Sequence, residues 1–347
     1  MPLVVAAAYG GPVVSEGERR QTTIYDVAAA AGVAPSTVSR AFSRPGRVRA
    51  ETAERIRAVA AELGYRANPQ ARALTTTRTG MLALVLADVT NPVFAEVVRG
   101  AGRACERDGY TMLLAETEES AEKERAMVDR AQGSVDAIVL TSSRMSDAAI
   151  RQIAKVEPLV VLNREVPGVP SVLVDFEPAM RRITEHLAEL GHRQITYVAG
   201  PEASWADGMR WRGLRLATEH LGIRLRRVGP VAPTVAGGQT AVVDWDDHRT
   251  SAVVAYNDMV AIGIVRRLAA SGVRVPEDVS VVGFDNTPVG ELVTPALTTV
   301  AAPLRALGET GASNAIALAA GARSRATDPI RLPTRLIARA STGPVRG

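Results

Sequence analysis

Cysteine is almost absent from this sequence, since Cys105 is the only one among 347 residues. A single thiol excludes an intramolecular disulfide framework and a zinc site built from cysteines. No apolar run reaches the roughly 18 residues that a membrane span needs. The apolar start, residues 1–8, lacks the basic lead of a signal peptide. We therefore expect a protein of the reducing cytoplasm that does not enter a membrane, with residues 1–21 as a flexible extension.

The sequence also lacks the motifs of common catalytic sites. It has no Gly-rich phosphate loop, no nucleophile elbow and no metal-binding cluster. His186, His192, His220 and His248 show neither metal-ligand spacing nor a nucleophile partner. These absences argue against an enzyme and predict neither a metal ion nor another cofactor.

Positive charge is concentrated near the amino terminus. The whole chain has a formal net charge of +4. Residues 22–80 carry nine arginines against four acidic side chains, whereas residues 81–347 have a net charge of −1. A small basic unit within a larger, nearly neutral chain is typical of a protein that binds a polyanion through that unit.

Residues 22–67 show the periodicity of three short helices. Apolar side chains recur at helical spacing over residues 24–31, and Gly32 then supplies the backbone freedom that a sharp turn requires. A second helix is expected over residues 35–42, because proline is tolerated in a first turn. A third repeats over residues 51–63 and ends at a glycine. This order predicts a helix-turn-helix unit.

The second of these helices carries side chains suited to DNA. Val38 and Ala41 are expected to face the core, which leaves Arg40 and several hydroxyls on the other side. Short hydroxyls approach bases and phosphates closely, and an arginine can bind O6 and N7 of guanine together. The basic loop over residues 44–49 suits phosphates. A helical hairpin used for protein contacts is the alternative interpretation.

The string Thr23–Arg40, with Glu62–Tyr65 and Ala71–Leu74 behind it, resembles the lactose/galactose repressor (LacI/GalR) family of bacterial transcription regulators. The similarity extends to about residue 342. It implies a homodimer that binds a near-palindromic double-stranded DNA operator, and a hinge over residues 68–80 that becomes helical when two copies meet on DNA. Leu74 matches the leucine that enters the minor groove. The implied DNA-binding residues are Thr23, Tyr25, Pro35, Ser36, Thr37, Ser39, Arg40, Arg47, Arg72, Ala73 and Leu74.

From residue 81 onward, short apolar runs alternate with helical stretches. Such runs predict buried parallel strands joined by crossover helices. Two doubly wound sheets of this size imply a cleft between two lobes, with ligand-binding groups at the carboxyl ends of the strands. The predicted strands are 82–86, 111–114, 137–140, 159–162, 171–174, 195–198, 252–255 and 279–282.

The expected fold is a small all-α helix-turn-helix DNA-binding domain plus an α/β periplasmic-binding-protein-like core of two doubly wound parallel-sheet lobes. The DNA-binding domain covers residues 22–67 and the core residues 81–342. The tail that follows is too short for the heptad repeats that make some relatives tetrameric. The expected segments are an N-lobe at about 81–177 and 302–328, a C-lobe at about 178–301 and 329–342, and a tail at 343–347.

Polar residues follow several predicted strands and are expected to meet in the cleft. An arginine, carboxylates and an amide can satisfy hydroxyls both as donors and as acceptors, while a phenylalanine offers a flat apolar face. This is the chemistry of a sugar or polyol pocket. The resemblance implies effector contacts from Asn91, Phe94, Asp175, Arg210, Asn257 and Asp285, and the weaker candidates are Asp88, Ser142, Arg164, Ser204 and Trp205.

Each of these residues also has an ordinary structural interpretation. Asn257 can cap the helix that follows it, Asp285 can close a turn, and Arg210 can pair with a surface carboxylate. Their shared position at strand exits, together with the resemblance, favours the pocket.

The sequence therefore predicts a transcriptional regulator, in particular a repressor, whose operator affinity is controlled by a small effector. A sugar or polyol is favoured over a purine, because Pro233 stands where some purine-binding relatives stack an aromatic ring. Regulation by a purine or another metabolite stays open. A transport-type sugar-binding protein is a further alternative, but it needs an export signal and has no use for residues 22–74.

Overall fold

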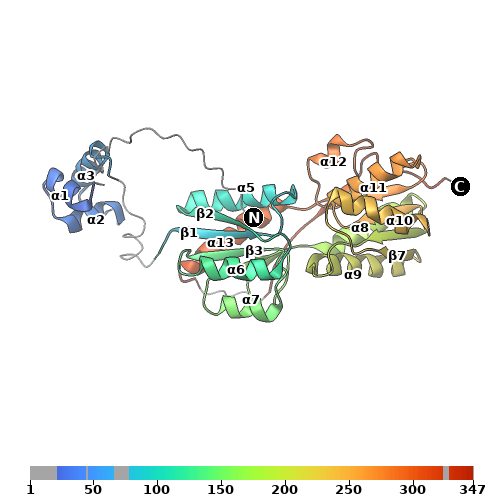
Figure 1. Ribbon diagram of the computed structural model, residues 1–347, viewed down its shortest axis with the longest axis horizontal. Helices are drawn as coiled ribbons and strands as arrows, with labels where there is room; N and C mark the ends of the chain where they lie inside the picture. The colour runs from blue at the N-terminus through green and yellow to red at the C-terminus, as the bar shows by residue number, and fades with distance from the viewer. Residues whose placement is uncertain (1–21, 44–45, 66–77, 323–327, 347) are drawn as a thin grey trace, which may run out of the picture. The chain divides into compact units, whose positions relative to one another are not determined.

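The computed structural model of the chain describes residues 22–43, 46–65, 78–322 and 328–346. The chain divides into two compact units, residues 1–79 and 80–347 (Figure 1). Most of the expected hinge lies outside the described residues, and so do Arg72, Ala73 and Leu74 with their predicted DNA contacts. Within the described ranges, no helix combines the length and the apolar character that a membrane crossing requires.

The amino-terminal unit packs three helices around a small apolar core. Gly32 ends the first helix with a φ of +65°, a left-handed conformation that lets the chain turn sharply into the second. Val27, Val38 and Ile56, one from each helix, are fully buried together. The predicted helix-turn-helix is confirmed. The helices are α1 (Ile24–Ala31), α2 (Pro35–Ser43) and α3 (Ala50–Glu62).

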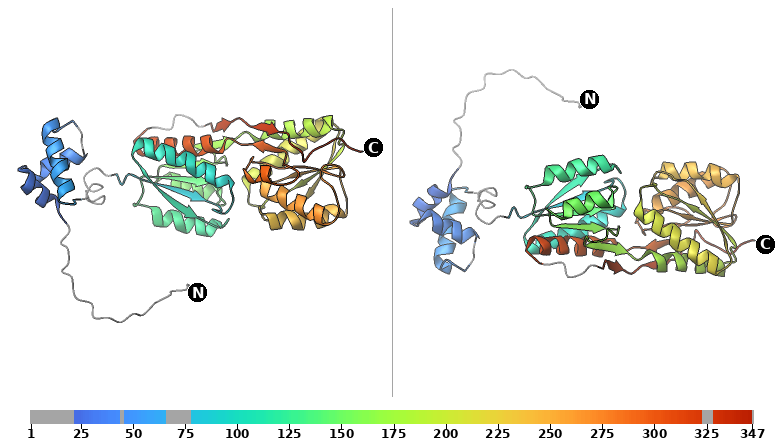
Figure 2. Two further views of the ribbon diagram at one scale, coloured as in Figure 1. Left: turned by 90° about the horizontal axis from the view of Figure 1, so that it is seen from above. Right: turned by 90° about the horizontal axis from the view of Figure 1, so that it is seen from below.

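The second unit contains two lobes, each a parallel sheet between two layers of helices (Figure 2). The N-lobe sheet has the strand order β11-β5-β4-β3-β1-β2. Helices α5 and α13 cover one face and α6 and α7 the other. The strands are β1 (Met81–Leu86), β2 (Thr111–Glu116), β3 (Ala137–Thr141), β4 (Leu159–Leu162), β5 (Ser171–Val174) and β11 (Ile330–Leu332), and the helices are α5 (Val93–Asp108), α6 (Ala121–Ala131), α7 (Asp147–Ala154) and α13 (Leu304–Ala319).

The C-lobe repeats this arrangement with the strand order β7-β6-β8-β9. Helices α8 and α9 pack on one face of the sheet, and α10 and α11 pack on the other. The strands are β6 (Gln194–Val198), β7 (Arg224–Val228), β8 (Ala252–Ala255) and β9 (Ser280–Val282), and the helices are α8 (Phe176–Glu189), α9 (Trp205–His220), α10 (Val235–Asp246), α11 (Asp258–Ala270) and the short α12 (Val289–Leu292).

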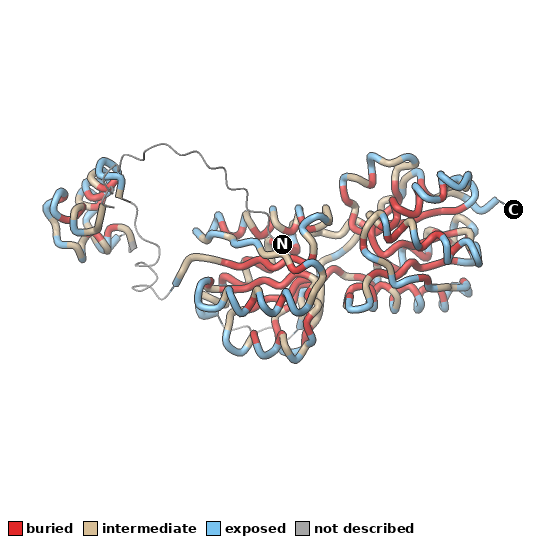
Figure 3. The backbone as a smooth tube through the Cα atoms, in the orientation of Figure 1, coloured by how far each residue is buried: buried red, intermediate tan, exposed pale blue. Residues whose placement is uncertain are grey.

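Burial on both faces explains why the central strands are continuous apolar runs (Figure 3). In β1, Leu82 and Leu84 face the layer of α5 and α13, while Ala83 and Val85 face the layer of α6 and α7. All eight predicted strands appear in the structure. The sequence pattern missed β7, because an edge strand that carries three arginines shows no apolar run.

The chain passes between the two lobes for the last time at a later residue than the sequence analysis predicts. Residues 329–342 were assigned to the C-lobe, but β11 pairs in parallel with β5 of the N-lobe, so this boundary was wrong. The strand is short, Ile330 and Arg331 are exposed, and it therefore lacks the signal of a buried strand. Two further short strands, β10 (Thr299–Ala301) and β12 (Arg335–Ile337), pair with each other in antiparallel fashion as separate crossing segments.

Candidate functional site

Helix α2 presents a polar face on the amino-terminal unit. Val38 and Ala41 are buried as expected, at 0% and 2% exposure. Ser36 and Arg40 are exposed on the same helix, and Thr37 is partly exposed. The remaining predicted contacts Pro35 and Ser39 are partly exposed, and Tyr25 and Arg47 are exposed. The fold thus places a short row of hydroxyls and a guanidinium where an external polyanion can meet them.

The Thr23 side chain caps the start of helix α1. Its hydroxyl accepts a hydrogen bond from the amide of Asp26, and the Asp26 carboxylate accepts one from the amide of Thr23 at 2.7 Å. This reciprocal cap satisfies two amides that the first turn of a helix leaves without partners. The Thr23 side chain starts α1, and any DNA contact from it has to coexist with this cap.

A small cavity of about 40 Å³ lies between the two lobes. Its walls come mainly from residues just after the carboxyl ends of strands and from the first turns of the helices that follow. Five of the six principal predicted residues line it, and so does Ser142. The complete lining is Asn91, Val93, Phe94, Glu119, Ser142, Arg144, Asn163, Val174, Arg210, Pro233, Tyr256, Asn257, Phe284, Asp285, Ala302 and Leu304.

Arg210 occupies the centre of the C-lobe wall. Its guanidinium carbon lies 3.8 Å from the ring centroid of Phe284 and 4.7 Å from that of Tyr256. Nη1 donates to the backbone carbonyl of Tyr256, and Nη2 lies 3.5 Å from Asp285 Oδ1. The side chain is 4% exposed, which rules out a surface ion pair. Nε is buried and has no partner, so this arginine keeps one donor for a ligand.

The Asp285 carboxyl group lies beside this guanidinium, with 3.5 Å between Oδ1 and Nη2. Its backbone has a φ of +112°, a conformation that residues with a side chain rarely adopt, and such strain is characteristic of functional loops. Burial raises the pKa of Asp285 to about 8, Arg210 opposes this shift, and the nearby Asp258 carboxyl adds to it. Burial also raises the pKa of Asp258 to about 6, against hydrogen bonds from Thr299 and Thr287.

Asn257 lines the cavity but is already hydrogen-bonded. Its Oδ1 accepts from the amide of Val260 at 2.9 Å and thereby caps α11. Its Nδ2 donates to the carbonyl of Pro233 at 3.3 Å. Asn257 therefore caps α11 and also lines the cavity. A ligand that accepts from its Nδ2 has to share or replace the hydrogen bond to Pro233.

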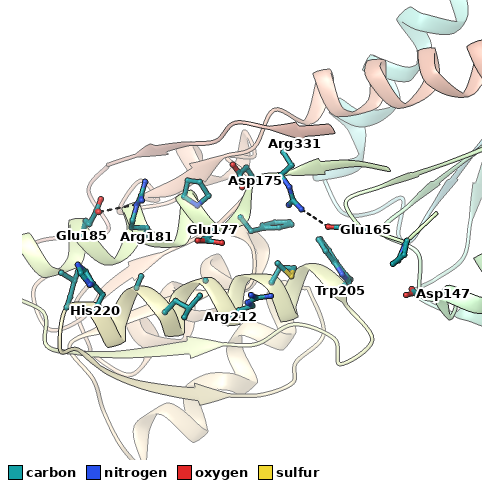
Figure 4. Close-up of a pocket in the computed structure, with 18 residues that line it drawn as sticks. Asp147, Glu165, Asp175, Glu177, Arg181, Glu185, Trp205, Arg212, His220 and Arg331 are labelled. Atoms are coloured by element: carbon teal, nitrogen blue, oxygen red, sulfur yellow. Dashed lines mark hydrogen bonds and ion pairs between the residues drawn. The ribbon is translucent and has the colours of Figure 1, made fainter. Parts of the chain in front are cut away.

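Two other candidates line a different hollow. Asp175 and Trp205 belong to a broad groove of about 1130 Å³ along α8 and α9 (Figure 4). The ion pair between Arg331 and Glu165, with 2.9 Å between Nη2 and Oε2, lies on the N-lobe side of that groove. The 40 Å³ cavity and this groove share no lining residue. Asp175 and Trp205 therefore line a different hollow from Arg210 and Asp285.

Three weaker candidates serve local structure instead. Asp88 accepts from the amide and hydroxyl of Thr90 and closes a turn. Ser204 caps α9 by accepting from the amide of Asp207. Arg164 donates to two backbone carbonyls of the loop after β3 and to a carboxylate at the start of α7. None of the three lines the small cavity.

Four polar lining residues are absent from the predicted set: Glu119, Arg144, Asn163 and Tyr256. Asn163 and Tyr256 directly follow the apolar runs of β4 and β8, so the strand-exit signal was available for them. Arg144 stands three residues beyond β3, and nothing local distinguishes it from a surface arginine. Among the described residues, no group of three or more His, Cys, Asp or Glu side chains is arranged to hold a metal ion.

Comparison with known proteins supplies independent information. Residues 23–68 match a family model described as bacterial regulatory proteins, lacI family, and residues 184–342 match a model of a periplasmic binding protein-like domain. The chain is 32% identical over 335 residues to the HTH-type transcriptional regulator DegA of Bacillus subtilis (strain 168), which covers 94% of this chain and 99% of that protein.

Two further similarities cover most of the chain. It is 32% identical over 326 residues to the ribose operon repressor of Halalkalibacterium halodurans, covering 92% of this chain and 97% of the relative. Among solved structures, the Lac repressor dimer bound to operator and the anti-inducer ONPF superposes with a TM-score of 0.83 at 25% identity, covering 93% of this chain and 100% of that one. These relatives are transcriptional regulators rather than enzymes.

Proposed function

The chain belongs to the LacI family of bacterial regulatory proteins, and from that premise we propose that it represses transcription as a homodimer whose operator affinity changes when a sugar or polyol binds between its lobes. The family makes it a DNA-binding regulator controlled by a small effector. The repressor role, the effector class and the contacts of individual residues are the parts proposed here. Its site of action is the cytoplasm, where operator DNA lies.

The pairing of Arg210 with Asp285 is the observation that carries the effector proposal. Both side chains are buried at the carboxyl ends of the C-lobe strands, and an ion pair with 3.5 Å between its nearest atoms leaves hydrogen-bonding capacity unused. A sugar hydroxyl can hydrogen-bond with the Asp285 carboxyl group and accept from the Arg210 guanidinium at the same time. The ring of Phe94 on the opposite wall supplies the apolar face that a sugar ring also needs.

The size of the cavity links binding to movement. Pockets that enclose small ligands usually hold roughly 300–1,000 Å³, whereas this cavity holds about 40 Å³. A sugar can enter only if the lobes separate or the wall side chains move. We propose that this change in lobe arrangement is what alters the spacing of two DNA-binding units in a dimer.

Exposed apolar side chains support the homodimer. Leu113 and Leu114 of the edge strand β2 are 40% and 49% exposed, and Leu292 of α12 is 80% exposed. Large aliphatic side chains on an edge strand invite pairing with another protein surface. The proposed dimer interface contains these three leucines.

DNA footprinting combined with a sugar panel tests the proposed function. Purified full-length protein should protect a near-palindromic site upstream of genes for sugar metabolism, and one sugar of the panel should change the affinity for that site at fixed salt. Absence of a protected palindrome at low salt would refute the regulator. A response to purines alone, with no response to any sugar, would refute the effector class and leave the regulator in place.

A further inference from the structure

Asp258 is a fully buried carboxyl group to which the proposed function gives no role. It is the first residue of α11 and is 0% exposed. Asn257 already caps this helix, so α11 does not need the Asp258 side chain for its start. A carboxyl group removed from water is costly unless hydrogen bonds replace that water. The reason for its position therefore lies outside its own helix.

The Asp258 side chain is hydrogen-bonded to two other segments of the chain. Its Oδ2 accepts from the amide of Thr287 at 2.6 Å and from the hydroxyl of the same residue at 2.9 Å. Its Oδ1 accepts from the hydroxyl of Thr299 at 2.6 Å. Asp258 thereby ties the start of α11 to the loop after β9, residues 283–287, and to the crossing strand β10.

The loop after β9 lies directly against this carboxyl group. A Cβ atom on Gly283 would overlap with Oδ1 of Asp258, so only glycine permits this approach. The amide of Asp258 also donates to the carbonyl of Phe284 at 2.9 Å. A shift of the loop therefore has to move Asp258 with it or break buried hydrogen bonds, which is unfavourable.

The same loop carries the proposed effector contact Asp285. Asp285 and Asn286 follow each other with φ values of +112° and +56°, which residues with a side chain rarely adopt. Thr287, whose amide and hydroxyl bind Asp258, comes next. Such strain persists only where surrounding contacts hold the backbone. Asp258 thus holds the loop that places Asp285 in the cavity wall, although Asp258 itself does not line the cavity.

Thr299 connects this carboxyl group to a crossing between the lobes. Its hydroxyl donates to Asp258 and accepts from the amide of Asn286 at 3.3 Å. The amide of Asp285 donates to the carbonyl of Val300 at 2.9 Å, so backbone hydrogen bonds support the same junction. After β10 the chain continues into α13 of the N-lobe (Figure 1). The wall that holds the effector contacts is therefore joined to a segment that leads into the other lobe.

We propose that Asp258 is a positioning residue for Asp285 and that its hydrogen bond with Thr299 transmits occupancy of the effector pocket to the crossing strand β10. This inference rests on the proposed function and adds the route by which the pocket controls the lobes. An effector that binds Asn257 and Asp285 contacts α11 and the loop after β9 together. Because the carboxyl group shared by these segments is fully buried, water cannot replace its hydrogen bonds, and the two segments move with β10 as one unit.

Thr299→Val in the full-length protein provides the first test. Valine keeps the shape of this side chain in β10 but has no hydroxyl for Asp258 or Asn286. The probes are D-ribose, D-glucose and D-galactose, added to gel-shift titrations of the operator at fixed salt. The titrations are run at about pH 7.5, above the pKa of about 6 of Asp258, so that its carboxyl group is ionised and accepts all three hydrogen bonds.

The change in operator affinity that the binding sugar causes should shrink roughly fivefold or more in Thr299→Val. The affinity of the DNA-free protein for that sugar, measured by calorimetry, should change less than this. A merely structural effect would weaken sugar binding or operator binding and would leave the sugar-induced change in operator affinity as it is in the unmodified protein.

Two further threonine variants make this test specific. Thr299→Ser keeps the hydroxyl and should retain the sugar-induced change. Thr184→Val is the matched control, since Thr184 is also 0% exposed in the C-lobe but donates to the Met180 carbonyl of its own helix. It should retain the change as well. A full sugar-induced change in Thr299→Val, or an equal loss in Thr184→Val, would overturn the inference while the effector class of the proposed function stands.

Asp258→Asn tests the other side of the hydrogen bond. Asparagine has nearly the same size, but its Nδ2 cannot accept from Thr287 or Thr299. The variant should weaken the sugar, because Asp285 loses its support, and should reduce the sugar-induced change in operator affinity. Adding Thr299→Val to it should reduce this change no further, because both substitutions remove the same contact. Additive losses would show that Asp258 and Thr299 act separately, and the proposed route would be wrong.

If no sugar binds the unmodified protein, the effector class fails, and hydrogen–deuterium exchange on the ligand-free full-length protein still decides whether these segments are joined. Thr299→Val should increase amide exchange over residues 258–261 of α11 together with residues 284–287, although Thr299 belongs to neither segment. Thr184→Val should leave both segments unchanged. Unaltered exchange in either segment of Thr299→Val would show that Asp258 does not join it to β10, and the inference would be wrong.

Discussion

Arg40 of α2 and Arg210 of α9 are both candidates for ligand contact, yet their surroundings are opposite. Arg40 is exposed, next to other polar side chains of the same helix. Arg210 is 4% exposed, is held against three aromatic rings, and lies 3.5 Å from a carboxyl oxygen of Asp285. The proposed DNA-binding surface takes its residues from one stretch of sequence, whereas the small cavity is lined by residues spread from Asn91 to Leu304.

This difference follows from what each region has to recognise. A surface that meets DNA keeps its cations in water until the polyanion replaces that water, so it needs no internal counter-charge. A closed pocket removes its charged groups from water before any ligand arrives, so each cation needs a partner within the protein. In the cleft, the buried guanidinium of Arg144 is paired with the Glu119 carboxylate in this way.

The largest expected effect is the loss of the effector response in a variant that still binds DNA. Asp285→Ala removes the carboxyl group beside Arg210 and leaves Nη2 of that buried guanidinium without this partner. The variant should lose the response to the effector while operator binding changes less than twofold. Gel-shift titration with and without the effector measures both. Asp246→Ala, at an exposed C-lobe position, is the control. A retained response would mean that the pocket lies elsewhere.

The second prediction uses the raised pKa of Asp285. Because burial raises the pKa of this carboxyl from 3.8 to about 8, the folded protein binds a proton that the unfolded chain has released. The contribution of this group to stability is full below pH 4 and is lost as the pH rises through 8. Asp285→Asn cannot lose a proton, so its free energy of unfolding relative to the unmodified protein should rise by a few kcal/mol between pH 5 and 8.

Denaturation at several pH values measures this trend. Asp258 also has a raised pKa, about 6, and stays in both proteins, so its own pH dependence largely cancels in the difference. If the difference in free energy of unfolding between the two proteins does not change with pH, Asp285 does not gain a proton on folding and the prediction is wrong.

The third prediction concerns the exposed region. Arg40→Ala should weaken operator binding by about 1–3 kcal/mol and relax selection at one base position. Stability should not change, because Arg40 is exposed and the core beneath it is formed by Val38 and Ala41. Gel-shift titration at fixed salt against single-base variants of the operator is the measurement. Arg55→Ala on α3, also exposed, should retain the base preference.

The smallest expected effect concerns the helix cap that Thr23 forms at the start of α1. Thr23→Ala removes the side-chain oxygen that accepts from the Asp26 amide and should destabilise the helical unit by roughly 1 kcal/mol. Thr23→Ser keeps the oxygen and should restore most of the loss. Amide exchange of α1 in the full chain reports the effect without involving the lobes. Equal exchange in all three proteins would assign the start of α1 to tertiary packing.

The sequence was informative where one side chain decides one local structure. Gly32 predicted the turn, Val38 and Ala41 predicted the buried face of α2, and eight apolar runs predicted eight strands. It failed at edge strands such as β7 and β11, whose exposed arginines and lack of an apolar run give no buried-strand pattern. The strand-exit rule nominated Asp285, which lines the small cavity, but also Asp175, which lines another groove; the resemblance, not a strand exit, added Arg210.

The amino-acid order alone determined the helix-turn-helix, the alternation of strands and helices, and the family resemblance, because periodicity and turn chemistry act over a few residues. Tertiary structure decided which polar side chains share a cavity. Arg144 and Tyr256 line one cavity because β3 and β8, in separate sheets, both end at the cleft between the lobes. Whether an arginine is a solvated surface charge or a buried ligand contact depends on packing between segments far apart in the chain.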